Sequence, residues 1–196
     1  ADPYNPEDTL MAYLNVSAVV VVVPGNILPV NPGPGQKDQK DDGSQEGKGM
    51  SNRACDPCKF AVLISGGVDA DNNHAKYWEN LVALYQFKVN TQGYCDSNVF
   101  VHYYDGTPRD GRIPAGRVRK ADKTKIDSSF QKVADRVAEC NDNGTPATFQ
   151  KMITNHGEED GDVCLLGDDV LTPEEIKAMQ EKVIDSCCRT VYDEFL

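Results

Sequence analysis

The sequence predicts an α/β protein whose mainly parallel sheet is covered by helices on both faces. Short apolar runs rich in β-branched and aromatic residues alternate four times with amphipathic segments between residues 55 and 196. That alternation is typical of consecutive βαβ units, which build a parallel sheet. With 196 residues, of which 39% are hydrophobic, the chain can form one ordinary domain with a core of its own.

The N-terminal part is predicted to be separate from this pattern. Residues 1–30 form an N-terminal strand segment, in which 10–30 indicate one or two strands broken at Pro24-Gly25-Asn26. The β-branched run 18–23 is far too short to span a membrane, so we predict a buried strand and no membrane span. Residues 31–54, rich in Gly, Pro, Lys and Asp, cannot bury enough apolar surface to become ordered, and we predict a flexible linker there.

The domain predicted for residues 55–196 follows in order. Its strands are expected at 60–65, 99–104, 148–154 and 190–196, with a short hairpin or edge piece at 163–166. A helix over 74–87 is indicated by apolar residues at helical spacing, and another is marked by Phe130, Val133, Ala134 and Val137. Between them, residues 109–120 are expected to form a long polar loop with several basic side chains.

A third helix has the clearest start in the sequence. Thr172 is a good N-cap, Pro173 suits the first helical position, and Glu175 stands three residues after the cap. Ile176 and Met179 then begin its buried stripe. The last predicted strand, "TVYDEFL", follows this helix.

The cysteines predict an oxidising compartment. Seven cysteines in 196 residues are too many for an ordinary cytosolic domain, and the glycosylation triplets at Asn15 and Asn143 agree with secretion. Cys55 and Cys58 form the single C-x-x-C, and only three histidines are present, so zinc is disfavoured. We expect either one short disulfide or two separate disulfides from this pair.

The formal net charge of −11 excludes a nucleic-acid partner, which requires a basic face. A solvated acidic surface is the simplest interpretation, and calcium held by clustered carboxylates is the alternative. We predict no cofactor and no defined metal site.

The stretch "VLISGGVDADNNHAKYW", residues 62–78, is compatible with two kinds of protein. Ser65-Gly66-Gly67-Val68-Asp69 matches five of the six positions of the phosphate-binding loop of ATP pyrophosphatases, but Ala70 replaces its serine. The same stretch suits the first strand and helix of a caspase-like cysteine peptidase. The crowding of acid and amide side chains before the helix disfavours the first interpretation.

Asn155-His156-Gly157 directly follows the predicted strand 148–154. Because sites in open parallel sheets lie at the carboxyl ends of the strands, His156 is placed where a general base is needed. The N–H of Gly157 could face a reacting carbonyl oxygen.

In this order, "KFAVLISGGVDADNNHAKYWENLVALYQF", "NVFVHYYDG" and "FQKMITNHGEEDG" resemble the caspase-like fold. Within it, residues 58–196 are most similar to the legumain-type (haemoglobinase) cysteine peptidases and their bacterial relatives. The resemblance implies a three-layer α/β/α architecture and a peptide or protein substrate. It also implies that His156 is catalytic and that Gly157 is an oxyanion-hole donor. Asn73, His74 and Lys76 are then expected near the histidine or the first specificity pocket.

The resemblance also places the nucleophilic cysteine just after the strand 190–196, beyond Leu196. Cys187 and Cys188 precede that strand, and Cys164 is too close to His156 in sequence, so none is a good nucleophile. We therefore expect a portion of a secreted cysteine endopeptidase, whose partner is a missing C-terminal segment of the same protein. A catalytically inactive caspase-like binding module is the alternative, and an ATP pyrophosphatase-type domain is the second.

Overall fold

The computed structural model describes residues 18–20, 54–155, 157–158 and 160–187. His156, the predicted strand 190–196, most of the N-terminal segment and nearly all of the predicted linker therefore lie outside the described residues.

The centre of the fold is a five-stranded sheet in the order β1-β5-β2-β3-β4. Its strands are β1 (Ala18–Val20), β2 (Lys59–Ser65), β3 (Val99–Tyr103), β4 (Val118–Arg119) and β5 (Thr148–Thr154). Strands β5, β2, β3 and β4 are parallel, and β1 pairs with β5 in the antiparallel direction. The predicted mainly parallel sheet is confirmed.

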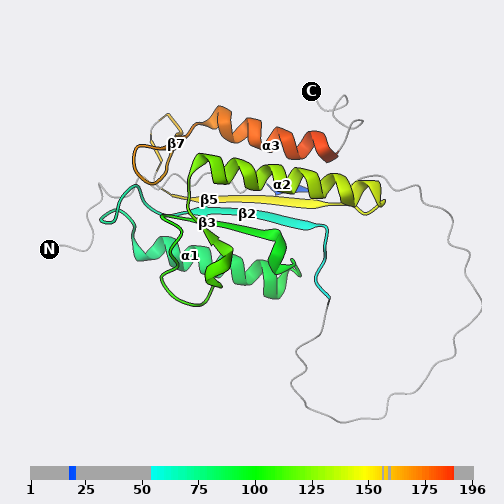
Figure 1. The fold of residues 1–196 in the computed structure, drawn as a ribbon, viewed down its shortest axis with the longest axis horizontal. Coiled ribbons are helices and arrows are strands. Elements are labelled where there is room, and N and C mark those ends of the chain that lie inside the picture. The colour runs from blue at the N-terminus through cyan, green and yellow to red at the C-terminus, as the bar shows by residue number, and fades with distance from the viewer. Residues whose placement is uncertain (1–17, 21–53, 156, 159, 188–196) are drawn as a thin grey trace, which may run out of the picture.

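Helices cover both faces of this sheet. The helices are α1 (Ala75–Gln86), α2 (Lys123–Asp142) and α3 (Pro173–Cys187). Figure 1 shows α1 on one side of the sheet and α2, with α3 beyond it, on the other. The predicted three-layer α/β/α architecture is confirmed.

The side chains of β2 alternate between the two faces of the sheet, and their apolar character explains why helices cover both faces. Phe60 and Val62 join the core beneath α2 and α3, whereas Ala61 and Leu63 join the core beneath α1. Successive side chains of a strand point to opposite faces, so a strand that is apolar at every position must be buried on both sides. Trp78 of α1 belongs to the core beneath that helix and is 1% exposed.

Two short stretches differ from the sequence prediction. The stretch predicted as a polar loop contains a 3-10 turn, Ala115–Arg117, which leads into β4. After α1 the chain continues as a π-helical segment, Phe87–Thr91. Both are too short to carry a periodic hydrophobic pattern, which is why neither was predicted. The predicted hairpin consists of β6 (Val163–Cys164) and β7 (Val170–Leu171), which pair in the antiparallel direction.

Two disulfides link the parts of the domain. Cys55 is bonded to Cys95, and Cys58 is bonded to Cys140. The C-x-x-C pair therefore takes part in two separate disulfides, the second of the two arrangements that the sequence left open. Cys164 is a free, buried cysteine. The disulfides are consistent with a secreted protein.

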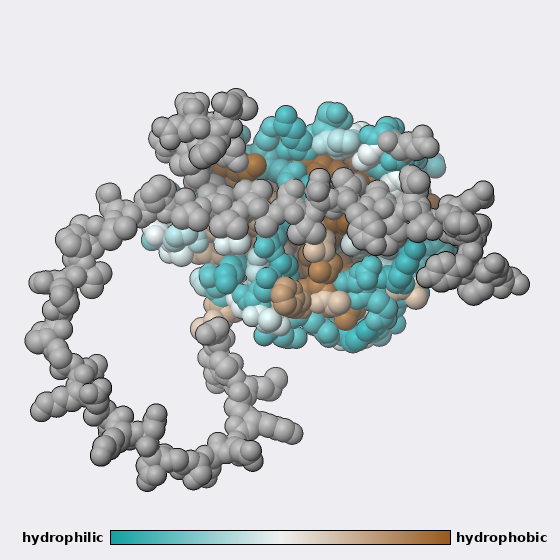
Figure 2. Space-filling model, turned by 180° about the vertical axis from the view of Figure 1, so that it is seen from behind, coloured by the Kyte–Doolittle hydropathy of each residue, from teal (hydrophilic) through white to brown (hydrophobic). Residues whose placement is uncertain are grey.

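The described part of the surface is mainly hydrophilic in the view of Figure 2, with hydrophobic residues gathered near the middle of that face. None of the helices within the described ranges has the length and apolar character needed to cross a membrane.

Candidate active-site edge

The carboxyl ends of the three central strands lie in one row. Ser65 at the end of β2 is in register with Tyr103 of β3 on one side and Thr154 of β5 on the other. Neighbouring parallel strands are about 4.8 Å apart. The segments that follow these three residues are therefore brought to one edge of the sheet, which is where ligand sites of such sheets occur.

The glycine turn after β2 is tightly enclosed by the protein. A Cβ atom on Gly66, whose φ is +134°, would lie 2.7 Å from the backbone nitrogen of Tyr104. A Cβ atom on Gly67 would lie 2.4 Å from the carbonyl oxygen of Asn72. Gly66 is required because the backbones that leave β2 and β3 touch here, and Gly67 is required because the segment after β2 folds back onto it at Asn72.

Ser65 is fully buried and its hydroxyl is used inside the protein. Its Oγ lies 3.1 Å from the carbonyl oxygen of Tyr77, 2.8 Å from that of Thr154 and 2.9 Å from the hydroxyl of Thr154. The hydroxyl therefore connects β2, α1 and β5.

The carboxylate of Asp69 accepts hydrogen bonds from Asn72 in the turn that follows β2. Its carboxylate accepts hydrogen bonds from the backbone N–H of Asn72 at 2.8 Å and from the side-chain amide of Asn72 at 2.9 and 3.0 Å. An acidic side chain of the chain itself thus binds one backbone N–H of this turn, and its negative charge disfavours a phosphate there. The helix begins only at Ala75.

Asn73 is held at this edge by the neighbouring strand. The hydroxyl of Tyr103 donates to Oδ1 of Asn73 at 3.0 Å, and the same hydroxyl accepts from Nε of Arg109 at 2.7 Å. The guanidinium of Arg109 also donates to the carbonyl oxygen of Asn73. The sequence predicted Asn73 as a site residue but missed Tyr103 and Arg109, because only the strand register brings them to it.

His74 and Lys76 lie at the start of α1. His74 is the N-cap residue, and its exposed ring lies 5.9 Å from the ring of Tyr77, centroid to centroid. Lys76 is exposed, with its ammonium 5.6 Å from the centroid of the same ring. Tyr77 itself is buried, and this burial, followed by the nearby Cys164, raises the pKa of its hydroxyl.

The loop after β3 is fixed to α1 by a charged cluster. Arg112 forms ion pairs with Glu79 at 2.6 Å and with Asp110 at 2.7 Å, and the indole N–H of Trp78 donates to Asp110 at 2.9 Å. The hydrogen bonds from Arg112 hold the pKa of the Asp110 carboxyl well below its usual range. This anchoring keeps Arg109 beside Asn73.

The segment that contains the predicted catalytic histidine is described on both sides of His156. Asn155 is buried, and its side-chain amide donates to the carbonyl oxygen of Cys164 at 2.6 Å. Gly157 forms an isolated antiparallel bridge with Val163, in which the N–H of Glu158 donates to the carbonyl oxygen of Asp162 at 2.9 Å. The N–H of Gly157 is not the donor of that hydrogen bond. His156 itself lies outside the described residues.

Cys164 lies beside this segment but has the chemistry of a buried thiol. Its sulfur donates to a carboxylate oxygen of Glu158 at 3.6 Å. Burial raises the pKa of the thiol, and the negative charge of Glu158 raises it further. A nucleophilic cysteine needs the opposite environment, in which positive charge favours the thiolate.

Metal binding has no preformed centre within the described ranges, where no group of three or more His, Cys, Asp or Glu side chains is arranged to hold an ion. The sequence did not predict the contact between Asn155 and Cys164. Their contact depends on the hairpin folding back onto the end of β5.

Comparisons with protein-family models, with curated proteins and with solved structures find no match for this chain.

Proposed function

We propose that the chain is the portion of a secreted cysteine endopeptidase that carries the general base and one oxyanion donor. The observation that carries the proposal is the common row formed by the ends of β2, β3 and β5. It brings the segments of Asn73 and Tyr104 to the edge at which β5 ends and Asn155 follows. His156 follows β5 at that edge in sequence, so its imidazole would act there.

The proposed reaction is hydrolysis of a peptide bond. A cysteine thiolate attacks the carbonyl carbon, and the carbonyl oxygen becomes an oxyanion that the N–H of Gly157 stabilises. His156 then gives its proton to the leaving amine as the carbon–nitrogen bond breaks. Water, deprotonated by His156, attacks the thioester, releases the acid and restores the thiol.

The thiol in this proposal comes from a segment that follows Leu196. Four of the cysteines are bonded in disulfides, and Cys164 is kept protonated by burial and by Glu158. The side of β5 away from β2 is paired with β1, so a strand formed by 190–196 would have to replace β1 and run parallel to β5 for a following thiol to reach the edge at which β5 ends. Asn73, held by Tyr103 and Arg109, and the exposed His74 and Lys76 would contact the substrate.

The test is peptide hydrolysis by the 196-residue chain and by a chain extended through its natural continuation. We expect cleavage of peptides by the extended chain only, and a loss of roughly 10²–10⁴-fold in His156→Ala. Cys164→Ser is the matched control, because it removes a thiol that the proposal leaves out, and it should retain activity. Cleavage by the 196-residue chain that depends on His156 would contradict the proposal.

The same measurement separates the alternatives. An extended chain that binds peptides but does not hydrolyse them would favour the inactive binding module. The ATP pyrophosphatase alternative predicts micromolar ATP binding that Gly67→Asp abolishes, measurable by calorimetry. The buried hydroxyl of Ser65 and the turn closed by Asp69 disfavour it.

A further inference from the structure

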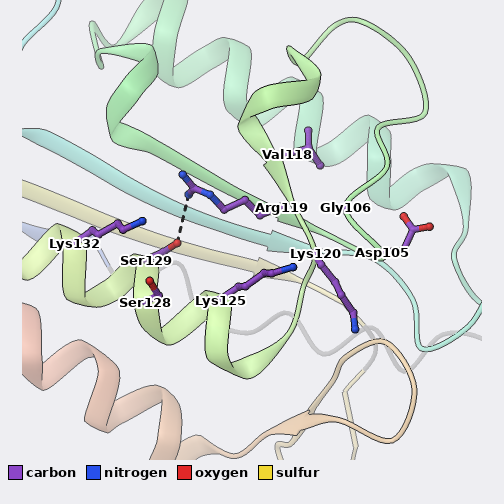
Figure 3. Close-up of a pocket in the computed structure, with 9 residues that line it drawn as sticks. All are labelled: Asp105, Gly106, Val118, Arg119, Lys120, Lys125, Ser128, Ser129 and Lys132. Atoms are coloured by element: carbon purple, nitrogen blue, oxygen red, sulfur yellow. Dashed lines mark hydrogen bonds between the residues drawn. The ribbon is translucent and has the colours of Figure 1, made fainter.

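A hollow between β4 and α2 is lined by basic and hydroxyl side chains. Its volume is about 520 Å³. The lining consists of Asp105, Gly106, Val118, Arg119, Lys120, Lys125, Ser128, Ser129 and Lys132. Figure 3 shows Arg119 reaching from β4 toward Ser129 on α2, with the ammonium of Lys132 directed toward the same region. We call this set of residues the basic hollow.

The charge of the basic hollow is opposite to that of the whole chain. Its lining carries four cationic side chains and one carboxylate, that of Asp105, so its formal charge is +3. The chain as a whole has a formal net charge of −11, with 20 Lys and Arg against 31 Asp and Glu. Because the chain has more carboxylates than cations, an ordinary part of its surface would place more than one carboxylate near four cations.

Arg119 is a partly buried cation of this set. Its guanidinium packs 5.1 Å from the centroid of the Phe100 ring and donates to the hydroxyl oxygen of Ser129 at 3.4 Å. No ion pair joins it to a carboxylate in the described part of the chain. Burial, followed by the charge of Arg117, lowers the pKa of this guanidinium. A partly buried cation without a counter-ion is stabilised by an anion that binds to it.

Ser129, which lines the basic hollow, is held by His102, a fully buried residue of β3. Its Nδ1 lies 3.1 Å from the carbonyl oxygen of Lys120, so Nδ1 carries the proton and donates. Its Nε2, 2.9 Å from the hydroxyl of Ser129, must then accept the proton of that hydroxyl. The oxygen lone pairs of Ser129 are left for Arg119, and the guanidinium is held in place before any ligand binds.

The remaining cations stand around the opening. Lys120 and Lys132 form no ion pair with a carboxylate among the described residues, whereas Lys125 lies 3.6 Å from Asp122. The hydroxyl of Ser128 lines the same hollow from the exposed side of α2. Two cations that form no ion pair among the described residues, Arg119 and Lys132, therefore point toward one another beside the hydroxyl groups of this open hollow, whereas the ammonium of Lys120 is directed away from them in Figure 3.

We propose that the basic hollow binds the tetrahedral oxyanion of a small phosphate or sulfate monoester. Such a group offers several acceptor oxygens, which Arg119 can engage with paired N–H donors while Lys132 supplies a point charge. The volume lies within the range of about 300–1,000 Å³ that small-molecule sites occupy. A long polyanion is disfavoured, because it would have to lie along the strongly acidic remainder of the chain.

The experiment is calorimetric titration of the 196-residue protein with inorganic phosphate and, separately, with inorganic sulfate at one fixed low ionic strength. We expect saturable binding with one site. Lys132→Gln, an exposed position, should weaken it about tenfold, which is the size of one charge-assisted hydrogen bond. Arg119→Gln should abolish it. Lys177→Gln, which removes an equal charge from the exposed face of α3, should leave the affinity within about twofold.

The relative affinity for the two anions identifies the class of ester that the basic hollow binds. Tighter binding of phosphate assigns the hollow to phosphate esters, and tighter binding of sulfate assigns it to sulfate esters. The proposal is overturned if neither anion binds saturably up to about 10 mM, a range that includes weak millimolar sites. It is also overturned if Lys177→Gln weakens binding as much as Lys132→Gln, or if a short DNA duplex binds more tightly than both anions. Circular dichroism of Lys132→Gln confirms that the compared variant is folded.

Discussion

His102 is a buried residue whose protonation is coupled to the stability of the domain. Burial is the main reason that the pKa of its imidazole is lowered from 6.5 to about 4. The unfolded chain therefore binds a proton at a higher pH than the folded chain does. The stability that neutral His102 contributes is complete above pH 6.5 and is lost as the pH falls from 6.5 toward 4.

We expect the free energy of unfolding of the protein to decrease over that interval by on the order of 3 kcal/mol on account of His102. His102→Gln should be less stable at neutral pH, because it disturbs the contacts with Lys120 and Ser129, but its stability should depend less on pH. Urea unfolding at several pH values measures both. His74→Gln, at an exposed histidine, is the control and should keep the slope of the native chain. An unchanged slope in His102→Gln would show that this histidine does not titrate as argued.

At the scale of one element, the start of α3 shows a capping box that also contacts α2. The hydroxyl of Thr172 accepts from the N–H of Glu175 at 3.2 Å, and the carboxylate of Glu175 accepts from the N–H of Thr172 at 3.0 Å. The same carboxylate forms an ion pair with Lys123, the first residue of α2, at 2.8 Å. One glutamate thus satisfies a helix start and joins two helices that share the same layer.

Thr172→Ala should lower the free energy of unfolding by about 1 kcal/mol, because the N–H of Glu175 loses its acceptor. Thr124→Ala is the matched control, since Thr124 is an exposed residue of the first turn of α2 with no side-chain hydrogen bond to the described residues. It should be neutral or slightly stabilising, because alanine favours helix. Thermal unfolding followed by circular dichroism compares the two. Equal effects of both changes would mean that the capping contacts contribute nothing measurable.

At the scale of the whole molecule, one disulfide joins the start of β2 to α2 and the other joins the segments that precede β2 and β3. Cys58 precedes β2 and is bonded to Cys140 near the end of α2, across 82 residues. Cys55 is bonded to Cys95, before β3, across 40 residues. Both bonds therefore restrict the ends of elements at the amino edge of the sheet, opposite the candidate site.

We expect replacement of either disulfide by a pair of alanines to destabilise the domain by about 2–5 kcal/mol. Removal of the Cys58–Cys140 bond should have the larger effect, by roughly 0.6 kcal/mol in the loop-entropy model, because it closes the longer loop. Guanidinium unfolding of the two double variants measures the difference. The reverse order would show that strain or residual structure, rather than loop length, dominates. Mass spectrometry of the native protein with and without reductant should find both bonds, and fully reduced thiols would contradict the secretory assignment.

The sequence alone determined the elements whose physical signals are local. Strands β2 and β5 follow from apolar runs, α1 from residues at helical spacing, and α3 from its capping box, because alternation and capping act over a few neighbouring residues. It also indicated that residues after β2 and β5 form the candidate site, since parallel strands expose their ends at one edge.

Only the tertiary structure decided which distant residues meet. The register of β3 against β2 brings Tyr103 and Arg109 to Asn73, and the hairpin β6–β7 brings Cys164 to Asn155. Strand β4, Val118–Arg119, places Arg119 beside α2 and so forms one side of the basic hollow. It is too short to leave a hydrophobic pattern in the sequence. Such contacts depend on strand order and side-chain packing between residues far apart in the chain, and no local signal in the sequence encodes them.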